Sequence, residues 1–384
     1  MPALQQAQQT QAEIVNDLDN LESKFVPPSK WDEIAVQFRD VLHEQTECFN
    51  ALRWPPHQLD RVAFYKNGHL VSAAVILKMR FPVIGGGIAV VKWGPLWRPK
   101  GRPDDPKNLQ RTIDALKQIY ALDGGYFLSF FPRADPEISG IETQALEQSG
   151  FHPGEELASP DRYFVNMDLS LKGLRESLSQ KWRYNLKKAE KNELSARFVE
   201  GEDGFKTFMQ LYNAMIDRKA FHDTSAINTL QALMDAKEPA LRPLILIVEQ
   251  NGEPIAGGVV DASGERAVYL YGATNNRALP LKAGYVMHWE ISKHLVAAPH
   301  VRWYDLGGAD KDCHLHQFKR GFVGKRGQIS VTPRYYHFGA TLKVRALGHA
   351  LYFTRRKKGE FARILHDYRN RTKPAQVPNA SRQA

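Results

Sequence analysis

The feature that most constrains the fold of this chain is a set of four landmarks that occurs twice in the same order. Each set consists of an Asn-Gly pair between two apolar segments, a glycine that ends an apolar segment, a further apolar strand, and a Gly-Phe pair. The sets are Asn67, Gly94, the strand starting at Tyr126, and Gly150, then Asn251, Gly272, the strand starting at Val301, and Gly321. The offset between matching landmarks falls steadily, from 184 to 178, 175 and 171 residues. This steady decrease predicts a duplicated unit with small deletions in the second copy.

The apolar periodicity predicts the same elements in each copy: a helix, a β-hairpin turned at the Asn-Gly, then strand, helix, strand, helix and closing strand. The strands are expected over 62–65, 71–79, 88–93, 126–131 and 163–169, then over 195–199, 244–249, 255–261, 267–271 and 301–306. Helices are expected on the stripe Ile14, Leu18, Leu21 and Phe25, over 31–42, and over 174–192. An antiparallel hairpin that feeds crossover helices implies a mixed α/β sheet covered on both faces.

The length of 384 residues exceeds what one hydrophobic core usually supports, so two domains are expected. We divide the chain into a disordered or helical segment (1–27), a first domain (28–172), a second domain (173–340) and a basic helical tail (341–384). There is no run of about 20 apolar residues and no basic start followed by an apolar stretch, so neither a membrane span nor a signal peptide is expected. The two cysteines lie in different predicted domains, so we expect a protein of the reducing cytoplasm.

Most of the net charge of +10 lies in the tail, which contains eleven Lys and Arg residues but only two acidic residues, Glu360 and Asp367. The remaining chain is nearly neutral, and stable DNA binding is not expected. Apolar stripes flank the basic run 355–358 and predict two short amphipathic helices. Three alternatives stay open: packing on the body, peripheral contact of 341–373 with the anionic inner membrane face, and contact with tRNA phosphates.

The second copy also carries specific motifs, which read SQKWRYNLKKAEK (179–191), YLYGAT (269–274), AGYVMHWE (283–290), YDLGG (304–308) and FKRGF (318–322). The order of elements resembles the GNAT acetyltransferase fold. The motifs together resemble the FemABX family, peptidyltransferases that add amino acids to peptidoglycan precursors, and its shorter CelD-like acetyltransferase relatives. The resemblance covers about 174–325. In the first copy it rests on Phe49, Trp54 and the segment 92–97.

This resemblance implies two tandem GNAT-like domains, the first degenerate and the second catalytic, with the acyl donor held where two central strands splay apart. It implies transfer of an acetyl or aminoacyl group to an amine or sugar of a cell-envelope glycan or peptidoglycan precursor. The acceptor would be an anionic glycan or a nucleotide- or lipid-linked precursor, and the donor acetyl-CoA or aminoacyl-tRNA. The chain departs from the family in lacking the long helical arm, because 205–236 has room only for short helices.

The loop that cradles pyrophosphate in acetyl-CoA enzymes is also absent, and the triplet Gly85-Gly86-Gly87 is the nearest glycine-rich segment. Such a triplet is more often a flexible turn than an anion-binding nest. The donor therefore stays open.

Three residues are candidates for catalysis. Lys319 could stabilise a developing oxyanion, because the resemblance to the FemABX family gives this role to the lysine of the Phe-Lys motif. The alternative is a solvated lysine whose aliphatic stem covers Phe318. His288 could accept the proton of the amine, although a lone histidine on a helix is more often packed. Asp305 could orient a base or tie its own Asp-Leu-Gly-Gly turn.

Several residues are candidates for substrate binding. Arg183, Lys187 and Lys188 would share one basic helix face that grips a pyrophosphate, or form a solvated face paired with Glu190 and Glu193. Tyr269 and Tyr271 alternate along a strand and should share one face, for substrate binding or for packing. The motifs add Tyr285, Trp289, Phe318 and Arg320.

The segment 313–316, Cys-His-Leu-His, lacks a second ligand pair at zinc spacing, so no metal is expected. Two other functions remain open: a GNAT acetyltransferase that uses acetyl-CoA on an unrelated small amine, and a non-catalytic binding module in polysaccharide biosynthesis.

Overall fold

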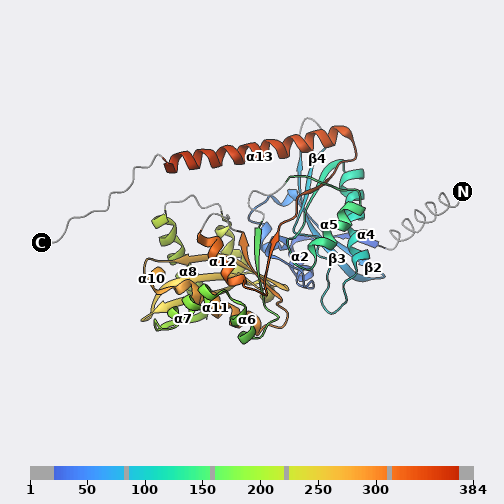
Figure 1. Cartoon of the computed structure of the whole chain (residues 1–384). Helices are drawn as coiled ribbons and strands as arrows, with labels where there is room; N and C mark the ends of the chain where they lie inside the picture. The colour runs from blue at the N-terminus through green and yellow to red at the C-terminus, as the bar shows by residue number, and fades with distance from the viewer. Residues whose placement is uncertain (1–20, 82–85, 156–160, 220–224, 309–313, 372–384) are drawn as a thin grey trace.

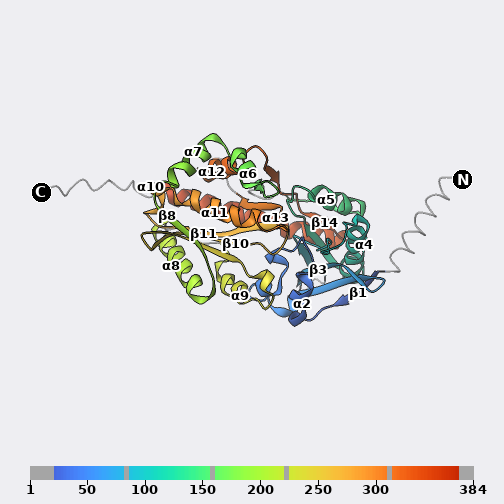
Figure 2. The same ribbon diagram turned by 90° about the horizontal axis from the view of Figure 1, so that it is seen from below.

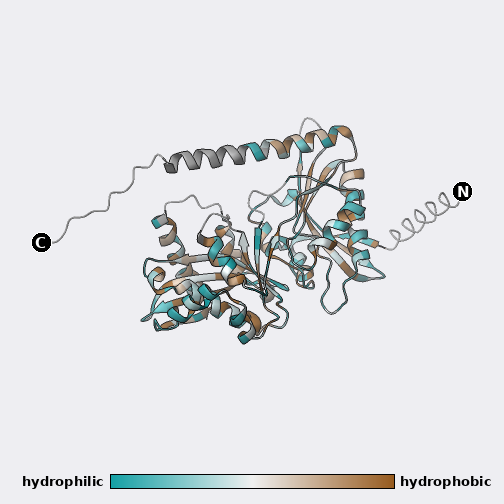
Figure 3. Ribbon diagram, in the orientation of Figure 1, coloured by the Kyte–Doolittle hydropathy of each residue, from teal (hydrophilic) through white to brown (hydrophobic). Residues whose placement is uncertain are grey.

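The computed structural model describes residues 21–81, 86–155, 161–219, 225–308 and 314–371 of the chain. Two seven-stranded mixed sheets, each with helices packed against it, lie next to each other, and a long helix runs across the top of the molecule (Figure 1). The helices that cover the sheets carry both hydrophilic and hydrophobic residues, as expected for helices with one buried face (Figure 3).

The two sheets have the same strand order. The first sheet consists, in spatial order, of β1 (Leu21–Phe25), β2 (Leu59–Lys66), β3 (His69–Arg80), β4 (Gly87–Lys92), β5 (Tyr126–Phe131), β14 (Tyr336–Phe338) and β6 (His152–Pro153). The second consists of β8 (Leu194–Val199), β9 (Leu244–Gln250), β10 (Glu253–Asp261), β11 (Arg266–Thr274), β12 (Trp303–Gly308), β7 (Asp161–Asn166) and β13 (Gln328–Val331). In both, the fourth and fifth strands are parallel and the other neighbours are antiparallel. The expected tandem α/β fold is confirmed.

The sixth strand of each sheet comes from the other copy. β7, expected as the closing strand of the first domain, pairs with β12 and β13, whereas β14 from the end of the second copy pairs with β5 and β6. Tyr163 and Val165 of β7 accordingly pack in the second core, and Tyr336 packs in the first. Apolar alternation predicts a strand but does not say which sheet it joins. The domain limits 28–172 and 173–340 stay a prediction. β7 and β14 do not follow them, because each strand pairs in the sheet of the other domain.

Both hairpins turn where the sequence predicts. Asn67 and Gly68 have φ angles of 51° and 75°, and Asn251 and Gly252 have φ angles of 54° and 78°. Two successive left-handed residues form the tight turn whose twist matches the flanking strands, which is why Asn-Gly is favoured there.

Three helix predictions are wrong in part. Residues 21–25 form β1, paired with β2 from Leu21↔Lys66 to Phe25↔Val62, because sheet pairing overrides the weak helical stripe; 14–20 lie outside the described residues. The helix expected over 31–42 ends at Ala35, and Phe38 then bridges to Pro99. The helix expected over 174–192 is broken, because the Ser179 hydroxyl accepts the Trp182 amide and starts a new helix.

The helices of the first domain are α2 (Pro28–Ala35), α3 (Glu47–Asn50), α4 (Pro106–Leu116) and α5 (Ser139–Gln148). Those of the second are α6 (Leu171–Ser177), α7 (Gln180–Ala189), α8 (Gly201–Lys219), α9 (Leu230–Met234), α10 (Ala278–Leu281), α11 (Ala283–Val296) and α12 (His314–Val323). The view from below shows α8 and α11 on either side of the second sheet (Figure 2).

The tail forms one helix, α13 (Leu342–Arg371), instead of two short ones. Its beginning packs on the first domain: Tyr352 is buried against Phe127 and Tyr335, and Gly348 lies directly against the Phe127 ring. Within the described residues, no helix is long and apolar enough to cross a membrane.

Candidate active site

The central parallel strands separate in the second sheet but not in the first. β11 and β12 pair at only three positions, from Arg266↔Trp303 to Val268↔Asp305, although both strands continue beyond them. In the first sheet, β4 and β5 pair at all six positions, from Gly87↔Tyr126 to Lys92↔Phe131. A gap between the central strands, which we call the splay, therefore opens only in the second domain.

Irregularities in both strands accompany the splay. Val259 of β10 pairs with Tyr271 of β11, whereas the adjacent Val260 pairs with Tyr269, so Leu270 is an extra, bulged residue. The pairing of β12 with β7 is likewise irregular between Asp305 and Gly308. Bulges are frequent next to active sites because they redirect side chains.

The bulge overturns the prediction that Tyr269 and Tyr271 share a face. Tyr269 packs on α11, with its ring 4.7 Å from that of His288, whereas Tyr271 packs in the core on the α8 side, 6.3 Å from Tyr212. One inserted residue shifts the two-residue alternation, and the sequence gives no sign of it. Burial raises the pKa of both hydroxyls, that of Tyr271 to about 12, so both are neutral donors.

Lys319 of α12 lies where β12 ends. Its side chain is buried, with 8% of the residue exposed, and its ammonium donates to the carbonyl oxygen of Gly308 at 2.7 Å. The ammonium also lies 5.9 Å from the centre of the Tyr163 ring. The lysine is therefore not a solvated surface residue, and its role in oxyanion stabilisation stays a prediction.

His288 of α11 is packed into an aromatic cluster. It is 6% exposed, its Nδ1 lies 3.1 Å from the Tyr304 hydroxyl, and its ring lies 5.4 Å from those of Phe318 and Phe322. Burial and, to a lesser extent, the charge of Lys319 lower its pKa to about 3. The imidazole is therefore neutral near pH 7 and a weak base.

Asp305 of β12 is completely buried and held by two arginines. One carboxylate oxygen accepts the Gly307 amide at 2.8 Å, and the other lies 2.5 Å from Arg162 and 3.2 Å from Arg266. Burial opposes its ionisation, but the charges of Arg162 and Arg266 outweigh burial and lower its pKa. Its described partners do not include His288, and the contact with Gly307 matches the predicted turn.

The structure brings part of the predicted binding set into the same cluster. The Phe318 ring lies 5.0 Å from that of Tyr285, whose hydroxyl accepts a hydrogen bond from Asn185 at 2.9 Å. Trp289 is buried in the second core, with Arg175 5.4 Å from its ring, and Arg320 is exposed.

The basic face predicted on α7 does not form as a unit. The Arg183 guanidinium donates to the carbonyl oxygens of Glu176 and Leu178, so it closes the end of α6. Lys187 and Lys188 are exposed, and Lys188 lies 4.6 Å from the Tyr184 ring. The sequence could not reveal this, because the break between α6 and α7 creates the carbonyl groups that Arg183 caps.

The first domain contains a pocket of about 540 Å³ that sequence reasoning missed. Phe49, Trp54 and Lys92, which carry the resemblance in the first copy, all line it. Glu44 lies at its wall, 3.4 Å from Lys92. Burial opposes the ionisation of Glu44, but the charges of His43 and Lys92 outweigh burial and lower its pKa to about 2.

The pocket lies beside the second domain, because its lining residue Phe131 packs in one cluster with Val268 of β11. Glu44 and Arg53, which line it, lie close enough to Tyr271 of β11 for their charges to act on the pKa of its hydroxyl. The signal available from the sequence was the spacing of Phe49, Trp54 and Lys92, but nothing in it showed that these segments meet.

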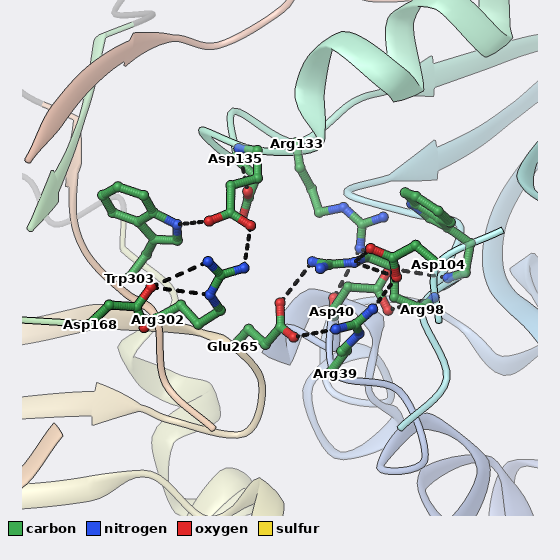
Figure 4. A network of polar contacts seen from close by, with 12 residues as sticks. Arg39, Asp40, Arg98, Asp104, Arg133, Asp135, Asp168, Glu265, Arg302 and Trp303 are labelled. Carbon is green, nitrogen blue, oxygen red and sulfur yellow. Dashed lines mark hydrogen bonds and ion pairs between the residues drawn. The ribbon is translucent and has the colours of Figure 1, made fainter. Parts of the chain in front are cut away.

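A polar network ties the two domains together beside this region (Figure 4). Glu265, between β10 and β11, pairs with Arg39 at 3.1 Å and with Arg98 at 2.8 Å, both in the first domain. Arg302 pairs with Glu137 at 2.5 Å, and the Trp303 indole donates to the same carboxylate at 3.2 Å. These contacts hold the loop before β11 and the start of β12 against the first domain.

The glycine triplet 85–87 and the segment 313–316 are each described in part, and the described residues have structural roles. Gly87 begins β4, where a Cβ would collide with the Met79 carbonyl oxygen and the Tyr126 ring; Gly85 lies outside the described residues. His316 hydrogen-bonds to the Tyr163 hydroxyl, and Cys313 lies outside the described residues. No group of three metal-ligating side chains occurs among the residues described.

Comparisons with known proteins agree with this geometry. Residues 176–320 match the acetyltransferase (GNAT) domain family. The crystal structure of FemX is similar, with a TM-score of 0.66 and 16% identity, over 85% of this chain and 98% of that one. A conserved protein of unknown function from Bacteroides thetaiotaomicron VPI-5482 has a TM-score of 0.54 and 12% identity, over 83% and 98% of the two chains. The search of curated proteins gave no match.

Residues 176–320 therefore form a GNAT-type acyltransferase domain. The whole chain has the fold of FemX, with two similar domains in tandem, and the matched domain is the second, which contains the splay.

Proposed function

We propose that this acyltransferase moves an acetyl or aminoacyl group to an amine or sugar of a cell-envelope glycan or peptidoglycan precursor. In this proposal the acyl donor enters the splay between β11 and β12, and the acceptor occupies the first-domain pocket. The observation that carries it is the asymmetry of the two sheets: only β11 and β12 separate, and the ammonium of Lys319 lies at the end of β12.

The chemistry of acyl transfer fits these groups. The acceptor nitrogen or oxygen attacks the acyl carbonyl carbon, the carbonyl oxygen becomes an oxyanion, and the bond to the leaving thiol or hydroxyl then breaks. In the proposal, the Lys319 ammonium, which is hydrogen-bonded to the carbonyl oxygen of Gly308, turns to the oxyanion and contributes most in the transition state. The proton that the acceptor loses ends on the leaving group, which departs as a neutral thiol or hydroxyl compound. His288, with a pKa of about 3, is a poor base for carrying this proton.

The pocket suits a polar acceptor with an apolar part. Its volume of about 540 Å³ lies within the range of small-molecule sites, and Phe49 and Trp54 offer aromatic faces of the kind that stack on sugars and bases. Arg53 and Lys92 can bind phosphate or carboxylate groups, and ionised Glu44 can hold an amine. These cations would take over the anion recognition first expected from Arg183.

The tail contact with an anionic membrane face or with tRNA stays part of the proposal. Phe353 of α13 is exposed, and the cationic groups of Arg356 and Lys357 lie 5.6 Å and 5.8 Å from its ring. Basic groups around an exposed aromatic ring suit an anionic surface.

A thermal-shift panel with acetyl-CoA, a UDP-linked muropeptide and an aminoacyl-tRNA tests the proposal. A ligand at 100 times its dissociation constant stabilises the native state by about 2.7 kcal/mol, which is readily detected. Stabilisation by the muropeptide together with either donor supports the proposal. Stabilisation by acetyl-CoA alone favours a GNAT acetyltransferase of a small amine. A chain that binds the muropeptide but transfers nothing would be a binding module.

A further inference from the structure

We propose that Trp93 of the first domain is a positioning residue that keeps β11 and β12 of the second domain apart through Arg162 and Arg266. This inference rests on the proposed function only in that the splay is taken to receive the acyl donor. The first sheet, whose own central strands stay paired, would thus supply the support for the splay of the other.

Trp93 is buried at the domain boundary. It follows β4, it is 5% exposed, and its amide donates to the Phe131 carbonyl of β5 at 2.8 Å. Its φ angle of 57° is left-handed, which is unfavourable for a bulky side chain and is maintained only where the surroundings require it. The indole packs on Phe131 and, across the boundary, in the same cluster as Val268 and Leu270 of β11.

Two guanidinium groups lie against this single indole. Arg162 and Arg266 lie 4.6 Å and 4.5 Å from the ring centre, and both pair with Asp305. Arg266 is 4% exposed, and its guanidinium nitrogens have no hydrogen-bond partner among the described residues, although one of them forms the ion pair with Asp305. A buried cation so poorly hydrogen-bonded depends on aromatic faces, here Trp93 and, at 5.7 Å, Phe164.

This cluster lies at the point where the strands part. Val268↔Asp305 is the last pair of β11 with β12, Val268 shares a cluster with Trp93, and Asp305 is held by the two stacked arginines. Leu270, the bulged residue two positions further along β11, packs on the same cluster. Because neighbouring strand residues point to opposite faces, Asp305 and Tyr304 lie on opposite sides of β12. Trp93 therefore supports the splay from the face opposite to His288, which contacts Tyr304.

The consequence is a coupling between the domains that is specific to the aromatic ring. A leucine could fill part of the space but could not hold two cations, so Arg266 would leave its stacked position and Asp305 would lose one of its partners. The strands would then close or fluctuate. A phenylalanine offers a smaller aromatic face and should preserve most of the arrangement.

The test compares Trp93→Leu with Trp93→Phe in the full chain. Hydrogen–deuterium exchange over 266–274 and 303–308 needs no substrate. We expect at least tenfold faster exchange there in Trp93→Leu and less than threefold change in Trp93→Phe. With the donor found in the ligand panel, Trp93→Leu should raise the donor KM at least tenfold and leave the acceptor KM within twofold. Equal effects of Leu and Phe, or no effect of Leu, would overturn the proposal.

Two further variants keep the test decisive. Glu265→Gln loosens the domain interface but leaves the Trp93 stack, so exchange over 303–308 should rise no more than exchange over 244–250 of the same domain. A selective increase over 303–308 equal to that of Trp93→Leu would mean that domain docking alone explains the effect. If Trp93→Leu does not fold, Arg162→Lys, which keeps the charge but loses the planar stack, should produce the same exchange pattern. A wild type that binds no donor would refute the proposed function, while the exchange results would still decide the role of Trp93.

Discussion

Acidification should destabilise this protein through His288 by an amount that follows from its burial. The imidazole has a pKa of about 3 in the folded chain, against about 6.5 for an ordinary histidine. Between these two pH values the unfolded chain binds a proton that the folded chain excludes, so the free energy of unfolding falls as the pH falls. The slope approaches 1.4 kcal/mol per pH unit, which gives a loss of about 2 kcal/mol between pH 7 and pH 5.

Urea unfolding of wild type and His288→Asn at pH 7, 6 and 5 measures the contribution of His288 to the pH dependence of the free energy of unfolding. Asparagine places a polar group near the position of Nδ1, so the hydrogen bond to Tyr304 can be kept without a titrating ring. The wild type should lose about 2 kcal/mol more than the variant between pH 7 and pH 5. His337, whose pKa is lowered by burial, is present in both proteins, and its contribution cancels. Identical pH dependences would show that His288 is hydrated and would refute the reasoning.

Three other perturbations have defined outcomes. Glu265→Gln should lower the free energy of unfolding by about 1–3 kcal/mol in urea titrations, because two arginines lose their shared carboxylate; a change below 0.5 kcal/mol would mean that the network is solvated. Glu44→Gln should raise the acceptor KM at least tenfold with little change in the donor KM, and the reverse pattern would place the acceptor elsewhere. Deletion of 341–384 should lower Tm because Tyr352 leaves Phe127, whereas deletion of 359–384 should leave Tm within about 2 °C and weaken binding to anionic vesicles; a small effect of the longer deletion would contradict the packing.

The repeated elements could be predicted because each depends on local chemistry. An Asn-Gly turn needs only two left-handed residues, and a strand such as 126–131 needs only an apolar segment between turn signals. The exchange of β7 and β14 could not be predicted, because the side chains of β7 would suit either core and only the three-dimensional path of the chain decides.

The site was predicted less completely for the same reason. Lys319 was identified from its motif, and the structure places it at the end of β12. The sheet faces on which Tyr269 and Tyr271 lie depend on a single bulged residue. The structural role of Arg183 depends on the helix break between α6 and α7. Neither feature leaves a periodic signal. Trp93 was included in the segment 92–97, but its two arginines come from β7 and β11, far away in the sequence.

Steady-state kinetics of Lys319→Ala, with the donor and acceptor found in the ligand panel, test the central claim most directly. If the ammonium stabilises the oxyanion at the splay, kcat should fall by about 10²–10³-fold, equivalent to about 3–4 kcal/mol, with little change in either KM. Lys319→Arg should restore only part of the loss, because a planar fork cannot replace a compact ammonium. Lys325→Ala, which removes an exposed lysine six residues further on, should retain wild-type kcat. A near-wild-type kcat for Lys319→Ala would contradict the account, since it would show that the lysine only fastens the end of β12.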